Sequence, residues 1–182
     1  MRVVVITPPE PVVSLAETKL HLRVEHDVDD ALIEGLMAAA TANIDGPDGW
    51  LGRCIGEQTL EAGLDGFVYD PIALPFPPII DVEGIRYEAV GGGWHDVDPA
   101  VFEIRDGRVG TAWGKSWPST RRYRGASRTV LIRYRAGYDT VPAPIRVAIL
   151  MMVATMYERR GTNAPDMPAA AATLLGPYRV FL

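Results

Sequence analysis

The sequence predicts an α+β fold: a small helical bundle built from N- and C-terminal helices, with an inserted antiparallel β subdomain and an extended C-terminal arm. Two observations predict it. Apolar residues recur at helical spacing near both ends of the chain, whereas the middle alternates apolar with polar residues and is broken by turn residues. The chain has 182 residues, 48% of them hydrophobic, which is enough for a real core.

We expect four parts along the chain. They are an N-terminal helical part (residues 1–52), an inserted β subdomain (53–140), a C-terminal helix that completes the helical domain (141–161) and a C-terminal arm (162–182). Fifteen prolines and eighteen glycines are many for this length, and they indicate a middle of short segments joined by turns.

A capping box marks the first helix. Ser14 precedes Glu17 by three residues, so that each side chain can satisfy an unpaired amide of the first turn. The helix is expected over about Leu15–Leu22. A polar turn follows, in which Asp29 or Asp30 can cap a second helix that ends at residues 46–49. Its amphipathic stripe consists of Leu32, Ile33, Leu36, Met37, Ala40 and Ile44.

The middle region is expected to form short strands. The candidate segments are 59–61, 72–74, 82–87, 101–104 and 129–134. The glycines at 91–93 and the pair Asp106-Gly107 supply the positive backbone angles that hairpin turns need. The proline-rich segment 75–78 lacks amide donors and cannot be a central strand.

Helical periodicity returns after Pro142, a residue type that suits a helix start. The apolar positions are Ile145, Ala148, Ile149, Met152, Val153 and Met156. Arg159 and Arg160 suit a helix C-terminus, and Gly161 follows as the stop. Residues 167–175 can form a further short helix. We expect the faces around 32–44 and 145–156 to pack into one core.

Composition excludes several classes of protein. A formal net charge of −5 and a pI near 5.2 argue against affinity that depends on neutralising many duplex phosphates. The single cysteine, Cys54, excludes an internal disulfide. The apolar run in residues 1–9 is too short for a signal peptide, and no stretch approaches the roughly 18 apolar residues that cross a bilayer. We expect a soluble chain made in the cytosol, with no membrane partner.

Catalytic motifs are not visible in the sequence, so we predict no enzyme activity, no cofactor and no metal. His26 lies beside aspartates that could hold a metal, but a solvated turn before a helix N-terminus is the better account; His21 and His95 are the other histidines. Cys54 is expected to be a buried structural thiol. The glycines at 91–93 lack the Lys-Ser/Thr of a phosphate loop.

Two features of the middle region are candidate partner contacts. The basic stretch contains Arg121, Arg122, Arg124 and Arg128. It either contacts an acidic partner or DNA, or it is an exposed loop ahead of a strand. Three tryptophans, Trp94, Trp113 and Trp117, either stack on a sugar or, more commonly for this residue, pack under short strands.

The chain end carries large apolar groups where polarity is usual. It consists of Tyr178, Arg179, Val180, Phe181 and Leu182. Such an end either folds back on its own core or docks into another chain, for instance by adding a strand.

The order of these elements resembles the head–tail connector (adaptor) proteins of tailed phages. Residues 14–23, Asp29-Asp30-Ala31-Leu32-Ile33 and the alanine-rich run to Asn43 look like the family's opening. Residues 74–82 are similar to its turn into the middle strands. Residues 134–138, then 141–145 and 157–160, resemble its closing strand and final helix. The resemblance spans roughly residues 12–160, and the glycine-rich break at 43–50 departs from the pattern.

The resemblance implies a structural, non-catalytic role in a virion, at the head–tail junction of a phage, prophage or gene transfer agent particle assembled in the host cytoplasm. It implies a ring of about twelve copies under the portal protein, with a stopper or tail terminator protein on the tail side. The ring would form part of the channel for double-stranded DNA during ejection, without sequence readout. It also implies that the arm, Tyr178 to Leu182, docks into the portal.

The alternative from a different class is a β-rich carbohydrate-binding or tail accessory module that uses the tryptophans. It predicts a stable monomer with affinity for sugars, and it gives no purpose to the helical ends.

Overall fold

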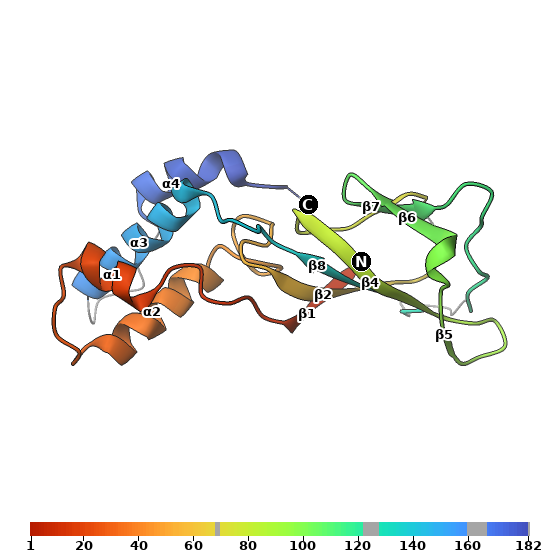
Figure 1. The fold of residues 1–182 in the computed structure, drawn as a ribbon, viewed down its shortest axis with the longest axis horizontal. Coiled ribbons are helices and arrows are strands. Elements are labelled where there is room, and N and C mark those ends of the chain that lie inside the picture. Colours follow the sequence, from red (N-terminus) through yellow and green to blue (C-terminus); the bar gives the residue numbers. More distant parts are fainter. Residues whose placement is uncertain (68–69, 122–127, 160–166, 182) are drawn as a thin grey trace. The chain divides into compact units, whose positions relative to one another are not determined.

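The computed structural model describes residues 1–67, 70–121, 128–159 and 167–181. It confirms a mixed α+β fold with, in these residues, four α-helices and two antiparallel sheets (Figure 1). The chain divides into two compact units. The β unit consists of Met1–Pro8 and Glu57–Gly137, and the helical unit consists of Pro9–Gly56 and Tyr138–Leu182.

A five-stranded antiparallel sheet forms the larger part of the β unit. Its order is β1 (Arg2–Thr7), β2 (Gln58–Leu64), β8 (Val130–Ala136), β4 (Ile79–Glu88) and β5 (Trp94–Asp96). The pairing of Leu60 with Tyr134 and of Ile132 with Ile85 places apolar side chains on one face, and all four are buried. The period of two along each strand therefore gives this sheet a buried face and a polar face.

A second sheet, of three strands in the described residues, completes the β unit. Its order is β3 (Ile72–Ala73), β7 (Arg108–Thr111) and β6 (Phe102–Arg105), and the 3-10 helix η1 (Pro99–Val101) leads into β6. Its paired residues Ile72 and Val109 are buried. The hydroxyl of Tyr134 in the larger sheet donates a 3.0 Å hydrogen bond to the carbonyl of Pro75, after β3.

The hairpin turns form where they were expected. Asp106 and Gly107 join β6 to β7 with φ of 50° and 70°, the conformation that a two-residue hairpin requires. The glycines at 91–93 join β4 to β5, with Gly92 donating to the carbonyl of Ala89 at 2.8 Å. Segment 75–78 forms no strand.

Strands β1, β5 and β7 were not predicted from the sequence. β1 pairs with β2 across more than fifty residues, for example Val3 with Ala62 and Val5 with Leu60. The pairing that stabilises β1 is therefore distant in sequence, and the apolar run of the first residues gives no local sign of its partner. This strand places the first eight residues in the β unit.

In the helical unit, α1 (Leu15–Leu22), α2 (Asp30–Ala42), α3 (Ala143–Glu158) and α4 (Ala169–Leu175) share one hydrophobic core. As predicted, the second and third helices supply much of it. Its buried members include Ile33, Met37, Ala40, Ile44, Ile145, Ala148, Ile149, Met152 and Val153. The 3-10 helix η2 (Gly176–Tyr178) follows α4. Arg160 and Gly161, expected at the end of the third helix, lie outside the described residues.

The cap of α1 forms at the predicted residue. The Ser14 hydroxyl accepts a 3.1 Å hydrogen bond from the Glu17 amide. The Glu17 side chain instead accepts from Arg146 of α3 at 2.6 Å, so one half of the capping box holds two helices together. α2 ends at Ala42, two residues before Ile44, which is nevertheless fully buried in the core.

Candidate assembly surfaces

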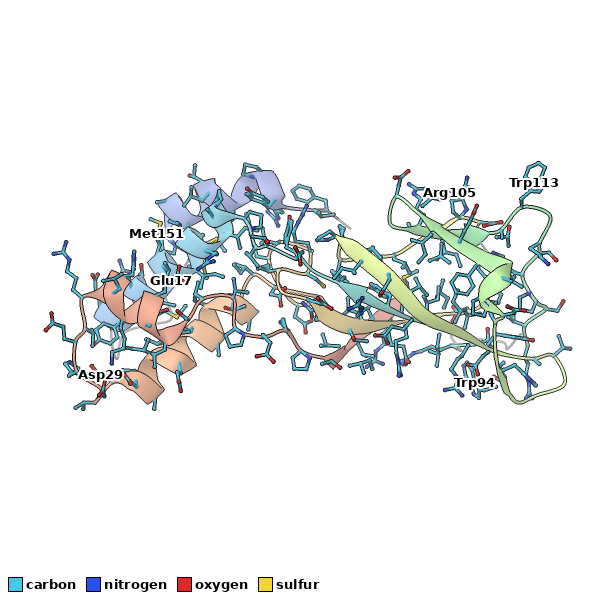
Figure 2. All side chains as sticks on the ribbon, in the orientation of Figure 1. Glu17, Asp29, Trp94, Arg105, Trp113 and Met151 are labelled. Carbon is cyan, nitrogen blue, oxygen red and sulfur yellow. The ribbon has the colours of Figure 1, made fainter. Side chains whose placement is uncertain are left out.

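The acidic turn between α1 and α2 is held by internal partners. Lys19 donates to the carboxylates of Asp27 at 2.6 Å and Asp30 at 2.7 Å, while Asp29 accepts from the Tyr157 hydroxyl at 2.6 Å. The hydrogen bond from Lys19 lowers the pKa of Asp27, and the same two contacts raise the pKa of Lys19. The aspartates near His26 thus tie the turn to the helices, and Figure 2 labels Asp29 at this end of the unit.

The other side chains considered for catalysis or metal binding are Cys54, His21 and His95. Cys54 is buried, and burial, followed by the charge of Asp45, raises the pKa of its thiol. His21 and His95 are exposed. Among the described residues, no group of three or more His, Cys, Asp or Glu side chains is placed to hold a metal ion. Within the same residues, no helix combines the length and the apolar character needed to cross a membrane.

The described part of the chain end is anchored on the helical unit. The Val180 amide donates to the carbonyl of Leu51 at 2.8 Å. The guanidinium of Arg179 lies over the ring of Trp50, 4.2 Å from its centroid, and over that of Phe181 at 4.8 Å. Tyr178 is half-buried against the core, whereas Phe181 is 82% exposed. Leu182 lies outside the described residues. Residues 178–180 are therefore fixed on the helical unit, and the ring of Phe181 projects from this fixed base.

The structure describes the first and the last arginine of the basic stretch, Arg121 and Arg128. Arg121 forms an ion pair with Glu88 at 3.2 Å, and its amide donates to the Glu88 carbonyl. Arg128 is exposed and lies flat against β2 at Gly63, where an added Cβ would stand 2.6 Å from the Arg128 Cδ. Arg122 and Arg124 lie outside the described residues.

The three tryptophans have different surroundings. Trp117 stacks on Phe67, with ring centroids 4.4 Å apart and planes 2° from parallel. Trp94 is 41% exposed and lies under the guanidinium of Arg86. Trp113 is 99% exposed and projects from the loop that follows β7, as Figure 2 shows. Trp117 thus packs against another aromatic side chain, whereas Trp113 stands exposed.

The polar face of the five-stranded sheet carries a row of ion pairs that sequence reasoning missed. Arg135 forms a two-pronged contact with Asp81, at 2.6 and 3.0 Å, and a further contact with Glu57 at 2.5 Å. Arg133 pairs with Glu61 at 2.8 Å on the neighbouring strand. The hydrogen bond from Arg135 lowers the pKa of Asp81. Cross-strand register brings these opposite charges together, and register is not visible in the sequence.

A hollow of about 920 Å³ opens in the β unit; we call it the β-unit hollow. It lies between the start of β1, the end of β2 and β3. Its walls include Met1, Leu64, Pro71 and Ile72, and Arg128 and Arg2 also line it. An open hollow with apolar walls and two cationic side chains is suited to an aromatic group.

Exposed aromatic groups, an apolar hollow and a charge-paired sheet face are features of contact between proteins. On an α+β fold, these features are those expected of a chain that contacts other proteins. Residues 12–85 match the family model of the Phage gp6-like head-tail connector protein, which confirms the resemblance seen in the sequence. The name of that family describes a connector protein, in line with the prediction of a structural role.

Solved structures share the fold over the full length of the chain. A chain from the neck of an empty gene transfer agent (GTA) particle, computed with C6 symmetry, is 21% identical, with a TM-score of 0.79. A chain from the virion of a native GTA particle is 21% identical, with a TM-score of 0.78. A third, from the neck of a native GTA particle computed with C12 symmetry, is 19% identical, with a TM-score of 0.72. Each comparison covers 100% of this chain and 97% of the other. Among curated proteins, no significant match is found.

Proposed function

We propose that this protein is a head–tail connector (adaptor) subunit that works as one copy in a ring of about twelve, between the portal protein and the tail. The family match over residues 12–85 carries this proposal. Full-length similarity to chains from GTA necks supports it, and the C6 and C12 symmetries of those necks are both compatible with twelve copies. The location would be the virion neck, after assembly in the host cytoplasm.

The ring would form part of the channel for double-stranded DNA. The chain carries 23 acidic against 18 basic residues, and the ion pairs on the polar sheet face compensate charge locally. A weakly repulsive or balanced lining lets a polyanion slide, whereas a basic lining would hold it by phosphate contacts. The proposed contact with DNA is therefore passive and involves no base readout.

The end of the chain would dock into the portal. The hydrogen bond from Val180 to Leu51 and the stacking of Arg179 on Trp50 fix the direction of the segment. Phe181 then projects with 82% of its surface exposed, and an aromatic ring held in this way is a typical interface anchor. The helices would form the bundle that carries this arm, and a stopper or tail terminator protein would bind the opposite side of the ring.

The test is a binding experiment with the purified chain and its cognate portal ring, imaged by negative stain. We expect an added ring of density on the outer end of the portal. A monomer that ignores the portal, and that binds a glycan in a screen, would instead establish the carbohydrate-binding alternative.

Variants of the chain end test the proposed docking into the portal separately from ring formation. Deleting residues 176–182 should abolish portal binding, because the deletion removes Phe181 together with Arg179 and Val180, which hold the segment on Trp50 and Leu51. Phe181→Ala should weaken binding while leaving the base intact. Leu20→Ala is the control, since Leu20 of α1 is also 82% exposed but lies outside the proposed dock.

A further inference from the structure

Trp113 is held out from the β unit by a defined turn. The Lys115 amide donates to the Ala112 carbonyl at 2.9 Å, and Gly114 at the third position has a φ of 71°. The Ala112 amide donates to Val101 at 2.8 Å and fixes the start of the turn. Glycine at the third position and a bond from the fourth residue to the first are typical of a type II turn. We call residues 112–115 the Trp113 turn.

The exposure of Trp113 is unusual for its residue type. Trp94 keeps 41% of its surface exposed under Arg86, and Trp117 is stacked on Phe67, whereas Trp113 is 99% exposed. A rigid turn loses little conformational freedom on binding, and tryptophan is enriched among the residues that dominate binding energy. The turn therefore presents a preorganised aromatic anchor.

The β-unit hollow has the features that would receive such an anchor. Its volume, about 920 Å³, exceeds that of an indole side chain several times, so the ring and its flanking backbone can enter. Leu64, Pro71 and Ile72 supply apolar contact, while Arg2 and Arg128 supply cations for the face of the ring. Gly63 matters here, because the absence of a side chain lets the Arg128 stem lie against β2.

We propose that the Trp113 turn of one copy inserts into the β-unit hollow of the next copy, and that this contact joins neighbouring subunits of the ring. The inference rests on the proposed connector function. Anchor and hollow share no residue: the anchor follows β7, and the hollow lies between the start of β1, the end of β2 and β3, the strand that pairs with β7. A contact between two different surfaces of identical chains is head-to-tail, and it closes into a ring when the rotation between copies permits.

Disulfide trapping tests the contact. Trp113→Cys and Asp65→Cys each place one thiol, the first in the turn and the second at the rim of the hollow. The native Cys54 is fully buried and does not compete. On the portal, a mixture of the two variants should form disulfide-linked dimers, whereas neither variant should form them alone. Disulfide-linked dimers of Trp113→Cys alone would indicate a symmetric contact between two turns and would overturn the proposal. A complete ring on the portal without cross-links in the mixture would also overturn it.

A second measurement uses substitution. Trp113→Ala should weaken association between subunits by roughly thirtyfold or more, the effect of removing one dominant aromatic contact. Trp94→Ala is the matched control, from the same unit and the same residue type, and should leave association unchanged. Equal effects of both substitutions would contradict the assignment.

The two proposals fail separately. A portal that recruits the wild-type chain, but without cross-links between the turn and the hollow, leaves the connector function intact and removes this inference. If the portal does not recruit the chain, the connector function fails, and trapping in concentrated free protein still decides whether the two surfaces meet.

Discussion

The carboxylate of Glu17 accepts a 2.6 Å hydrogen bond from the guanidinium of Arg146, which lies 129 residues further along the chain. The bond joins the first turn of α1 to α3. Both side chains remain partly exposed, at 31% for Glu17 and 43% for Arg146. The position that local sequence assigns to a capping box thus serves a long-range contact between helices.

Ser14→Ala should lower the free energy of unfolding more than Glu17→Gln. The Ser14 hydroxyl caps α1 by accepting from the Glu17 amide, and losing such a cap costs about 1 kcal/mol. A partly exposed ion pair contributes less than about 1 kcal/mol, because water and salt screen it. Urea unfolding of both variants provides the comparison; a larger effect of Glu17→Gln would show that the contact with Arg146 dominates.

Ile149→Ala in α3 should destabilise the chain by about 2–5 kcal/mol, because Ile149 is fully buried in the core of the helical unit. Val147→Ala is the control on the same helix, since Val147 is 43% exposed. The difference should appear as a lower thermal midpoint for Ile149→Ala alone. Similar midpoints for the two variants would contradict the assignment of this core.

Acid should weaken the β unit through Asp81. Arg135 lowers the pKa of Asp81 in the folded chain below its ordinary value, so the unfolded chain binds the proton more readily. The stabilising contribution is therefore fully present above about pH 4, and it is lost as the pH falls through the lowered folded value. Asp81→Asn should reduce the dependence of unfolding free energy on pH below 4, and urea unfolding of the variant and the wild type at a series of pH values measures the difference.

Gly107→Ala should destabilise the β6–β7 hairpin by about 1 kcal/mol. Gly107 has a φ of 70°, which alanine rarely adopts, and an added Cβ would lie 3.3 Å from a side-chain carbon of Ile79. Gly91→Ala, in the neighbouring β4–β5 turn, is the control, because its Cβ would meet nothing within 4 Å. Thermal unfolding of the two variants separates backbone strain at Gly107 from a general effect of added methyl groups.

Local chemistry made the helices and turns predictable. Ser14 caps α1, and Asp106-Gly107 forms its hairpin, because a few neighbouring residues decide these structures. The strand β1 was not predictable in the same way, since its pairing of Val3 with Ala62 depends on residues far along the chain.

The candidate surfaces also differ in whether neighbouring residues or the fold determine them. The aromatic chain end was visible as composition, whereas its anchoring by Leu51 and Trp50 required the fold. The exposure of Trp113 could not be told from that of Trp117, because one sequence does not show which ring finds a stacking partner. The ion pairs of Arg135 depend on strand register and were missed for that reason.

The division of the chain into two units has a mechanical consequence. The backbone passes between them after Pro8, after Gly56 and after Gly137. Three covalent tethers therefore join the units, and a protease nick in any one leaves the other two continuous. A force that pulls the two units apart is therefore shared by three peptide connections.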